Sequence, residues 1–132
     1  MRDREAILKI IDDAYATRMS GDKAALEQLW APGGVYHFAG DPNLLPDFPV
    51  GPTHGAPATS ALVDLFTFHS LERLDSVVEG GTAAVRWRVI LSTEGKEPVT
   101  TEILDLWTID GDGKIGSLVQ FGDTALVAGM LT

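Results

Sequence analysis

The segment LERLDSVVEGGTAAVRWRVILSTEGKEPVTTEILDLWTIDGDGKIGSLVQFG, residues 71–122, decides the fold class of this chain. Its apolar and β-branched residues form four strand-like runs, which span residues 71–79, 82–93, 98–109 and 114–122. The short stretches between the runs are rich in glycine and charged residues, which is typical of hairpin turns. The segment therefore predicts a four-stranded antiparallel meander.

The first half of the chain reads as helices around one short strand. Apolar residues recur three and four positions apart from Arg4 to Met19, which predicts a helix with one buried face. Asp22 is a suitable cap for a second helix, and Pro57 is tolerated in the first turn of a third. Helices are expected at 4–19, 22–30 and 56–68, a strand at 35–39, and a proline-rich loop at 40–55. Helices followed by long antiparallel strands predict one α+β domain over residues 1–132.

Composition limits the classes of partner. With 45% hydrophobic and 22% charged residues in 132 residues, the chain has the balance of one ordered globular domain. Its net charge of −9 repels phosphate backbones and anionic lipids, which argues against nucleic acid and membrane partners. The absence of cysteine excludes disulfides and thiolate catalysis. The charged start, without an apolar leader, favours a cytoplasmic protein.

No metal or other cofactor is expected. The three histidines, His37, His54 and His69, lack the spacing of a helical or finger-like metal site. The Asp110–Gly113 turn resembles the start of a calcium loop, but Phe121 stands where that loop needs glutamate. A hairpin turn explains these residues.

Several short sequence motifs, in their order and spacing, resemble those of a known family. Residues 20–22 with the apolar run 26–31 resemble the helix-turn-helix that opens the family's fold, and residues 35–40 resemble its valine-aromatic-histidine strand. Gly55 matches the glycine before the family's third helix, and residues 105–115 resemble its last hairpin. Together they resemble the SnoaL-like and ketosteroid isomerase-like branch of the nuclear transport factor 2-like superfamily over almost the whole chain. The resemblance implies a cone-shaped, curved antiparallel sheet with three helices on its concave face, around one apolar pocket.

The resemblance does not by itself imply a reaction, because this fold carries several enzyme classes and also binding modules. The leading hypothesis is a small-molecule enzyme of the SnoaL-like kind, which performs proton transfer on an apolar substrate without a cofactor. The reaction would be an isomerisation, cyclisation, dehydration or hydrolysis. The alternative is a non-catalytic module that binds a hydrophobic ligand or another protein. An open cavity with Asp105 and a second polar group within reach would favour the enzyme.

Asp105 is the most informative residue. Strand alternation places it with Ile103 and Trp107, and the resemblance makes that side the pocket face. A lone carboxyl among apolar side chains should have a raised pKa and could act as an acid, as an aspartic acid of ketosteroid isomerases does at the matching position. Alternatively, Asp105 accepts hydrogen bonds across the sheet and does no chemistry.

The other catalytic residues of ketosteroid isomerases have no counterpart at the matching positions of this sequence. By the resemblance, Ala14 stands at the tyrosine position and Phe38 at the position of the catalytic base. Tyr15 is one residue away, either in the core or with its hydroxyl in the cavity. An arginine-assisted, epoxide hydrolase-like site is disfavoured because the same resemblance places Arg86 and Arg88 on the outer face of the sheet.

Three residues could assist Asp105 in catalysis. Tyr36 could offer its hydroxyl to a substrate oxygen or form an aromatic wall. His37 resembles the SnoaL-like histidine, although alternation turns it away from Phe38. Asp123 resembles the acid that ends the last strand, but it is also a natural helix cap.

The residues expected to contact a ligand are mostly aromatic. His54 could close over the pocket mouth or be solvated, and Gln120 could alternate inward or outward. The expected ligand-binding set is Tyr15, Trp30, Phe38, His54, Phe66, Trp87, Trp107 and Gln120.

Two further surfaces are predicted. Ile90, Leu104 and Leu106 make the outer face of the sheet apolar, which predicts a homodimer through that face. The loop 40–55 holds four prolines, and Leu44, Leu45, Phe48 and Val50 are expected to pack as a rim over the pocket or onto a partner subunit.

Overall fold

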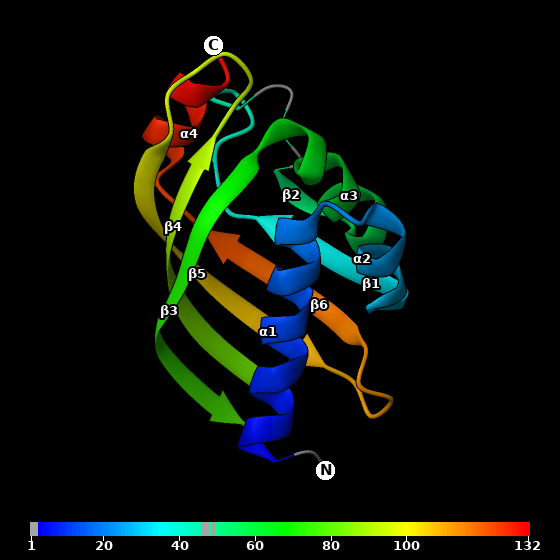
Figure 1. The fold of residues 1–132 in the computed structure, drawn as a ribbon. Coiled ribbons are helices and arrows are strands. Elements are labelled where there is room, and N and C mark those ends of the chain that lie inside the picture. Colours follow the sequence, from blue (N-terminus) through cyan, green and yellow to red (C-terminus); the bar gives the residue numbers. More distant parts are fainter. Residues whose placement is uncertain (1–2, 46–47, 49) are drawn as a thin grey trace.

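The computed structural model describes residues 3–45, 48 and 50–132, whose arrangement Figure 1 shows. The elements are α1 (Arg4–Ser20), α2 (Lys23–Gln28), β1 (Trp30–Phe38), β2 (Gly51–His54), α3 (Gly55–Leu65), β3 (Thr67–Glu79), β4 (Thr82–Ser92), β5 (Val99–Ile109), β6 (Ile115–Phe121) and α4 (Thr124–Met130). The strands form one sheet in the order β2-β1-β6-β5-β4-β3. The sheet is curved and open, and α1, α2 and α3 lie on its concave side (Figure 1). The predicted α+β fold is confirmed.

The four long strands pair as the predicted meander. β3 and β4, β4 and β5, and β5 and β6 run antiparallel. Gly80 and Gly113 in two of the turns have positive φ values of 57° and 79°, a conformation that glycine adopts without strain. β1 joins the meander by pairing in parallel with β6. Turn signals say nothing about this direction, because no hairpin connects β1 to β6.

The boundary between α2 and β1 differs from the prediction. α2 ends at Gln28 and β1 already begins at Trp30, where the second helix was expected to continue. Trp30 pairs with Ile115 of β6, and its indole Nε1 donates to Thr59 Oγ1 at 3.1 Å. These tertiary contacts outweigh the local helix preference.

Two other differences concern the ends of predicted segments. β2 lies inside the 40–55 segment that was expected to be irregular, and it pairs with β1 at the edge of the sheet, where proline is tolerated. α3 ends at Leu65 and not near Phe68, because β3 begins at Thr67 and pairs with β4.

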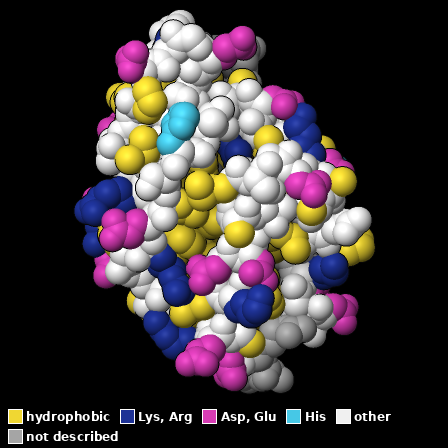
Figure 2. Space-filling view, viewed as in Figure 1, with side chains coloured by type: hydrophobic (Ala, Val, Ile, Leu, Met, Phe, Trp, Pro, Cys, Tyr) yellow, Lys and Arg dark blue, Asp and Glu magenta, His cyan; other side chains and the backbone are white. Residues whose placement is uncertain are grey.

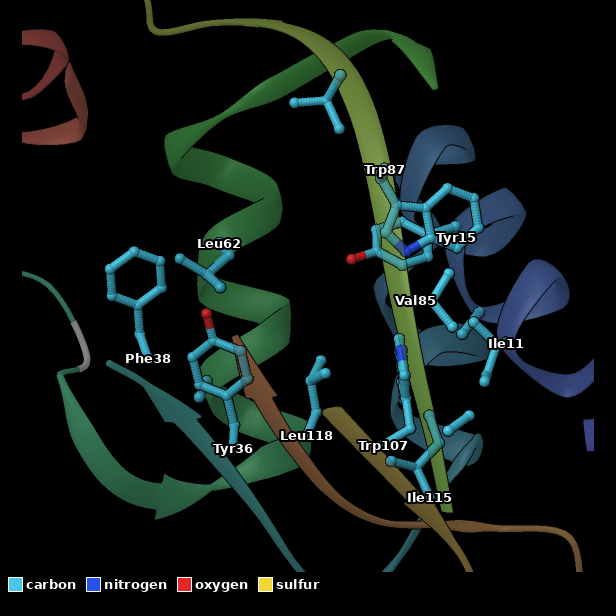
Figure 3. Close-up of a cluster of buried hydrophobic side chains, with 14 of the residues drawn as sticks. Ile11, Tyr15, Tyr36, Phe38, Leu62, Val85, Trp87, Trp107, Ile115 and Leu118 are labelled. Atoms are coloured by element: carbon cyan, nitrogen blue, oxygen red, sulfur yellow. The ribbon is translucent and has the colours of Figure 1, made fainter. Parts of the chain in front are cut away.

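Alternation along β4 separates core from surface as predicted. Val85, Trp87 and Val89 are buried on the concave side, where Figure 3 shows Val85 and Trp87 within the core cluster. Arg86 and Arg88 lie on the outer face, where they form ion pairs with acidic side chains of β3 and β5. The concave side is therefore apolar, and any polar group on it is a candidate for function.

Replacing Gly55 with alanine should destabilise the protein by about 1–3 kcal/mol. Gly55 begins α3 against the Trp30 ring, and a methyl group there would overlap three ring carbons. The ring cannot move away freely, because its indole N–H is bonded to Thr59. Urea unfolding followed by circular dichroism measures the loss. Gly129→Ala in α4 is the control, since its new methyl group meets no atom within 4 Å. Equal stabilities of the two variants would contradict this account of the packing.

Candidate functional site

Asp105 lies at the centre of the candidate site, on the inner side of β5. Its side chain is 0% exposed, and its Cα pairs in register with that of Gln120 on β6. Trp107, two residues later, is also buried, whereas Leu104 and Leu106 on either side of Asp105 are exposed. Strand alternation therefore places the carboxyl on the concave side, as expected.

Four side chains from four elements form one hydrogen-bonded network. The Tyr15 hydroxyl of α1 donates to Asp105 Oδ2, and Gln120 Nε2 donates to Asp105 Oδ1 at 3.0 Å and to Tyr15 Oη at 3.1 Å. The Tyr36 hydroxyl of β1 donates to Gln120 Oε1 at 2.7 Å. These bonds orient the Gln120 amide, because its oxygen accepts from the Tyr36 hydroxyl and its nitrogen donates to Asp105 and Tyr15. In Figure 3 the hydroxyls of Tyr15 and Tyr36 point into the space between their elements.

Burial raises the pKa of Asp105 from 3.8 to about 7, because water no longer stabilises the charged form. The hydrogen bonds from Tyr15 and Gln120 oppose this effect, as do the indole groups of Trp87 and Trp107 to a smaller extent. Asp105 therefore titrates near neutral pH, which is unusual for a carboxyl group.

Two tryptophans enclose Tyr15 and the carboxyl. The ring centroids of Trp87 and Trp107 lie 4.5 Å and 5.9 Å from that of Tyr15. The Nε1 atoms of both are buried without a hydrogen-bond partner among the described residues. Their N–H dipoles favour the ionised carboxyl without completing a bond to it.

Two adjoining pockets open next to this network. The inner pocket has a cavity volume of about 50 Å³, opens to solvent, and is lined by Ala14, Tyr15, Arg18, Leu26, Trp30, Tyr36, Thr59, Leu62, Trp107, Ile115, Leu118 and Gln120. The outer pocket has a cavity volume of about 60 Å³, and its lining includes Arg18, Phe38, Phe48, Leu62, Phe66, Phe68, Gln120 and Asp123. Figure 2 shows a hollow with hydrophobic side chains in the middle of this face. Asp105 lines neither pocket, because it lies behind Tyr15 and Gln120.

Arg18 is the residue of this site that the sequence analysis missed. It lines both pockets, together with Leu62 and Gln120. Its place on α1, three residues after Tyr15 and thus on the same helix face, was the available signal. The apolar spacing along α1 indicates a buried face, and it does not indicate a cation on that face.

Side-chain alternation along β1 places the predicted site residues of this strand on two opposite faces. Tyr36 and Phe38 are buried on the concave side, and each lines a pocket. His37 faces the other way and is half-buried, beside Val119 of β6 and Pro52 of β2 in the sheet register. The structure therefore does not bring His37 to the site, and its expected catalytic role stays a prediction that this placement does not support.

His54 also lies away from the network. It is exposed at the end of β2 and lines a shallow groove with Glu27, Trp30 and Pro57 that contains neither Asp105 nor Tyr15. Because β2 holds it against the edge of β1, it does not close over either pocket. The expected role of His54 at the pocket mouth is not supported by this placement.

Asp123 acts as a helix cap. Its carboxylate accepts a hydrogen bond from the Leu126 N–H at 3.0 Å, which begins α4. Asp123 is exposed at the wall of the outer pocket and makes no contact with the Asp105 network. The capping interpretation accounts for this residue.

The loop before β2 partly covers the outer pocket. Leu45 and Phe48 are buried, and the Phe48 ring meets Phe38 and Phe66 edge-on, with centroids 4.7 Å and 6.0 Å away. Leu44, in contrast, is 45% exposed on this chain. Pro46 and Pro49, two of the four prolines of this loop, lie outside the described residues.

Two other kinds of site are not found in the described part of the chain. No three histidine, aspartate or glutamate side chains there gather closely enough to hold a metal ion. None of its helices has the length and hydropathy needed to span a membrane.

Comparisons with known proteins agree with this architecture. The family model described as a SnoaL-like domain matches residues 11–118. No curated protein matches the chain at a significant level.

Several solved structures share the fold. A candidate isomerase from Bacillus subtilis is 15% identical, with a TM-score of 0.79 over 99% of this chain and 96% of that one. PrhC from Penicillium brasilianum is 17% identical, with a TM-score of 0.77 over 97% and 87%. A nuclear transport factor 2-like protein from Burkholderia thailandensis is 22% identical, with a TM-score of 0.72 over 100% and 99%. At these identities the likeness concerns the fold.

Proposed function

Because this chain belongs to the SnoaL-like domain family, we propose that it is a small-molecule isomerase or cyclase that moves protons with its own side chains. The observation that carries the proposal is the buried carboxyl of Asp105, whose pKa is about 7 and whose hydrogen bonds reach the inner pocket through Tyr15 and Gln120. A group that titrates near neutral pH can give and take protons at comparable cost. The substrate is a small apolar molecule, in keeping with the aromatic and aliphatic lining.

The protonation state of Asp105 sets the direction of the Tyr15 hydroxyl. When Asp105 is ionised, its oxygens accept hydrogen bonds from Tyr15 and Gln120. When it is neutral, its own O–H can donate to the Tyr15 oxygen, which frees the phenol hydrogen for the inner pocket. Tyr15 is then the group that touches the substrate, and Asp105 is the proton store behind it.

The proton must pass through Tyr15 in one concerted step. Burial, together with the neighbouring Asp105, raises the pKa of Tyr15 well above its usual value, so a tyrosinate would be a costly intermediate. As Tyr15 gives its hydrogen to a carbonyl oxygen of the substrate, Asp105 therefore replaces it. The substrate carbonyl oxygen gains this proton while a hydrogen on the neighbouring carbon leaves as a proton to solvent water, which yields the enol, the intermediate that isomerisation and ring closure next to a carbonyl share.

One observation favours the rival function of a non-catalytic binding module. Asp105 is 0% exposed and every oxygen of its carboxyl already has a protein partner, so the network could exist for structural reasons alone. A binding module would hold an apolar ligand in the same pockets without exchanging its protons.

Deuterium exchange distinguishes the two functions without knowledge of the natural product. The protein is incubated in D₂O with a panel of small apolar ketones, and NMR follows the hydrogens next to the carbonyl. An enzyme of the proposed kind accelerates their exchange above the rate with unfolded protein. Ketones that bind but exchange at the background rate would support the binding module instead.

A homodimer through the outer face of the sheet remains part of the proposal. Leu104, Leu106 and Phe121 are 44%, 42% and 46% exposed there. Register joins them into a patch, since Leu104 pairs with Phe121 across β5 and β6. A contiguous apolar surface of this kind is usually covered by a partner.

Sedimentation at micromolar concentration should therefore show a dimer, and Leu106→Glu should shift it to monomer by at least about tenfold in dissociation constant. Met19→Glu is the control, because Met19 is 42% exposed on α1, away from the sheet. A wild-type protein that sediments only as monomer would contradict the dimer.

A further inference from the structure

Arg18 occupies an unusual environment for a cation. Its Nη2 atom donates to the carbonyl oxygens of Leu62 and Phe66 at 2.9 Å and 2.7 Å, at the end of α3. Its guanidinium carbon lies 4.2 Å from the centroid of the Phe68 ring. Each of these partners is neutral, so Arg18 is held in place without being neutralised.

The guanidinium of Arg18 keeps unused hydrogen-bonding capacity. Arginine carries five N–H groups, and two on Nη2 suffice for the α3 carbonyls. Among the described residues no acceptor bonds to Nε or Nη1, and no carboxylate lies within ion-pair distance. The acidic neighbour Asp64 is bonded instead to Lys23 at 2.5 Å. The N–H groups on Nε and Nη1 therefore remain for a molecule in the pockets.

Burial makes this charge a cost to the apo protein. It lowers the pKa of Arg18 from 12.5 to about 10, which still leaves the side chain cationic at neutral pH. Arg18 is half-buried, and a cation that loses part of its hydration is often offset by a carboxylate partner. Arg18 has no carboxylate partner among the described residues, and it lies where the inner and outer pockets meet.

We propose that Arg18 makes the pockets selective for apolar molecules that carry one anionic oxygen group, a carboxylate or an enolate. The aromatic lining receives the apolar body, and the free Nη1 group of the guanidinium donates to an oxygen of the anion. This inference deepens the proposed function, on which it rests for the use of the pockets as a small-molecule site. It assigns the substrate class, which the family membership leaves open.

The negative net charge of the chain means that selectivity for an anionic ligand must arise locally, at Arg18. The chain carries a net charge of −9, so its surface repels small anions in general. Preference for an anion must therefore come from a local cation. Tyr15 and Tyr36, which also line the inner pocket, are neutral phenols, because burial raises the pKa of both well above the usual value.

Benzoate and benzamide are the probes, because they share size and shape and differ in charge. Titrations at neutral pH are followed by tryptophan fluorescence, since Trp30 and Trp107 line the inner pocket. The wild-type protein should bind benzoate about tenfold more tightly than benzamide. Arg18→Gln should remove this preference while benzamide binding persists. Arg88→Gln is the matched control, since it removes the same charge from the outer face.

Three outcomes would overturn the inference. They are equal wild-type affinities for the two probes, no benzoate binding at millimolar concentration, and an unchanged preference in Arg18→Gln. If Arg18→Gln fails to fold, Arg18→Lys replaces it. Lysine keeps the charge but cannot bond the α3 carbonyls and a ligand in the same planar arrangement, and should lose part of the preference.

The Asp105→Asn variant separates this inference from the proposed function. It should keep the benzoate preference, because Arg18 is untouched. Unchanged ketone exchange in Asp105→Asn, together with an intact benzoate preference, would end the proposed function and leave the binding inference standing. Loss of the preference in Arg18→Gln, with ketone exchange dependent on Asp105, would support both.

Discussion

Asp105→Asn should lower the rate of ketone exchange, and of any natural turnover, by about a hundredfold or more while the protein stays folded. Asparagine imitates the neutral carboxyl, because its amide N–H can donate to the Tyr15 oxygen and its carbonyl can accept from Gln120. It cannot give up a proton, so the store behind Tyr15 is lost. Exchange rates by NMR and a circular dichroism spectrum measure both parts of this expectation.

Asp123→Asn is the matched control for the loss of a carboxylate. Asp123 is exposed and caps α4, and asparagine is also a good cap, so both stability and exchange rate should remain close to wild type. An Asp105→Asn protein that exchanges ketone hydrogens at the wild-type rate would remove Asp105 from the chemistry.

The stability of the wild-type protein relative to Asp105→Asn should fall by roughly 4 kcal/mol as pH rises from about 4 to about 8. The folded protein keeps the proton on Asp105 up to about pH 7, whereas the unfolded chain releases it near 3.8. In that window the folded state binds more protons, so raising the pH favours unfolding. At about 1.4 kcal/mol for each pH unit, the difference between 3.8 and about 7 yields the stated amount.

Urea unfolding of both proteins across this pH range measures the effect. The other ionisable groups titrate alike in the two proteins, so their contributions cancel when the stabilities are subtracted. A difference that stays constant with pH would show that Asp105 has an ordinary pKa. A difference that changes in the opposite direction would show that its hydrogen bonds outweigh its burial.

Much of the fold could be predicted from local pattern. Hairpin turns such as 110–113 join strands that are adjacent in sequence, so their turn residues and alternation suffice to predict antiparallel pairing. Alternation also grouped the strand residues by face, and the family resemblance correctly identified the face of Asp105 as inward and that of Arg86 as outward. β2 and the parallel pairing of β1 with β6 escaped prediction, because they depend on contacts between distant segments.

The candidate site was predictable only in part. Asp105 stood out because a lone carboxyl in an apolar run is rare. Alternation grouped Tyr36 with Phe38 but did not decide which face points inward. Arg18 was missed because its partners are backbone carbonyls of α3, which no sequence pattern marks. For His37, the SnoaL-like motif and the strand alternation indicated opposite faces, and its placement follows the alternation.

The sequence by itself determined the helices of the first half, the meander that follows them, and the presence of one carboxyl in an apolar strand, since each depends on neighbours along the chain. Only the tertiary structure decided that Tyr15, Gln120 and Asp105 are hydrogen-bonded to one another, and that Arg18, with no carboxylate partner among the described residues, lies between two pockets. These relations join residues about 15 to 105 positions apart, as the Tyr15–Gln120 and Gln120–Asp105 bonds do. Helix and strand periodicity tells which face a side chain occupies, but the packing of α1 and α3 against the sheet determines which side chain it meets.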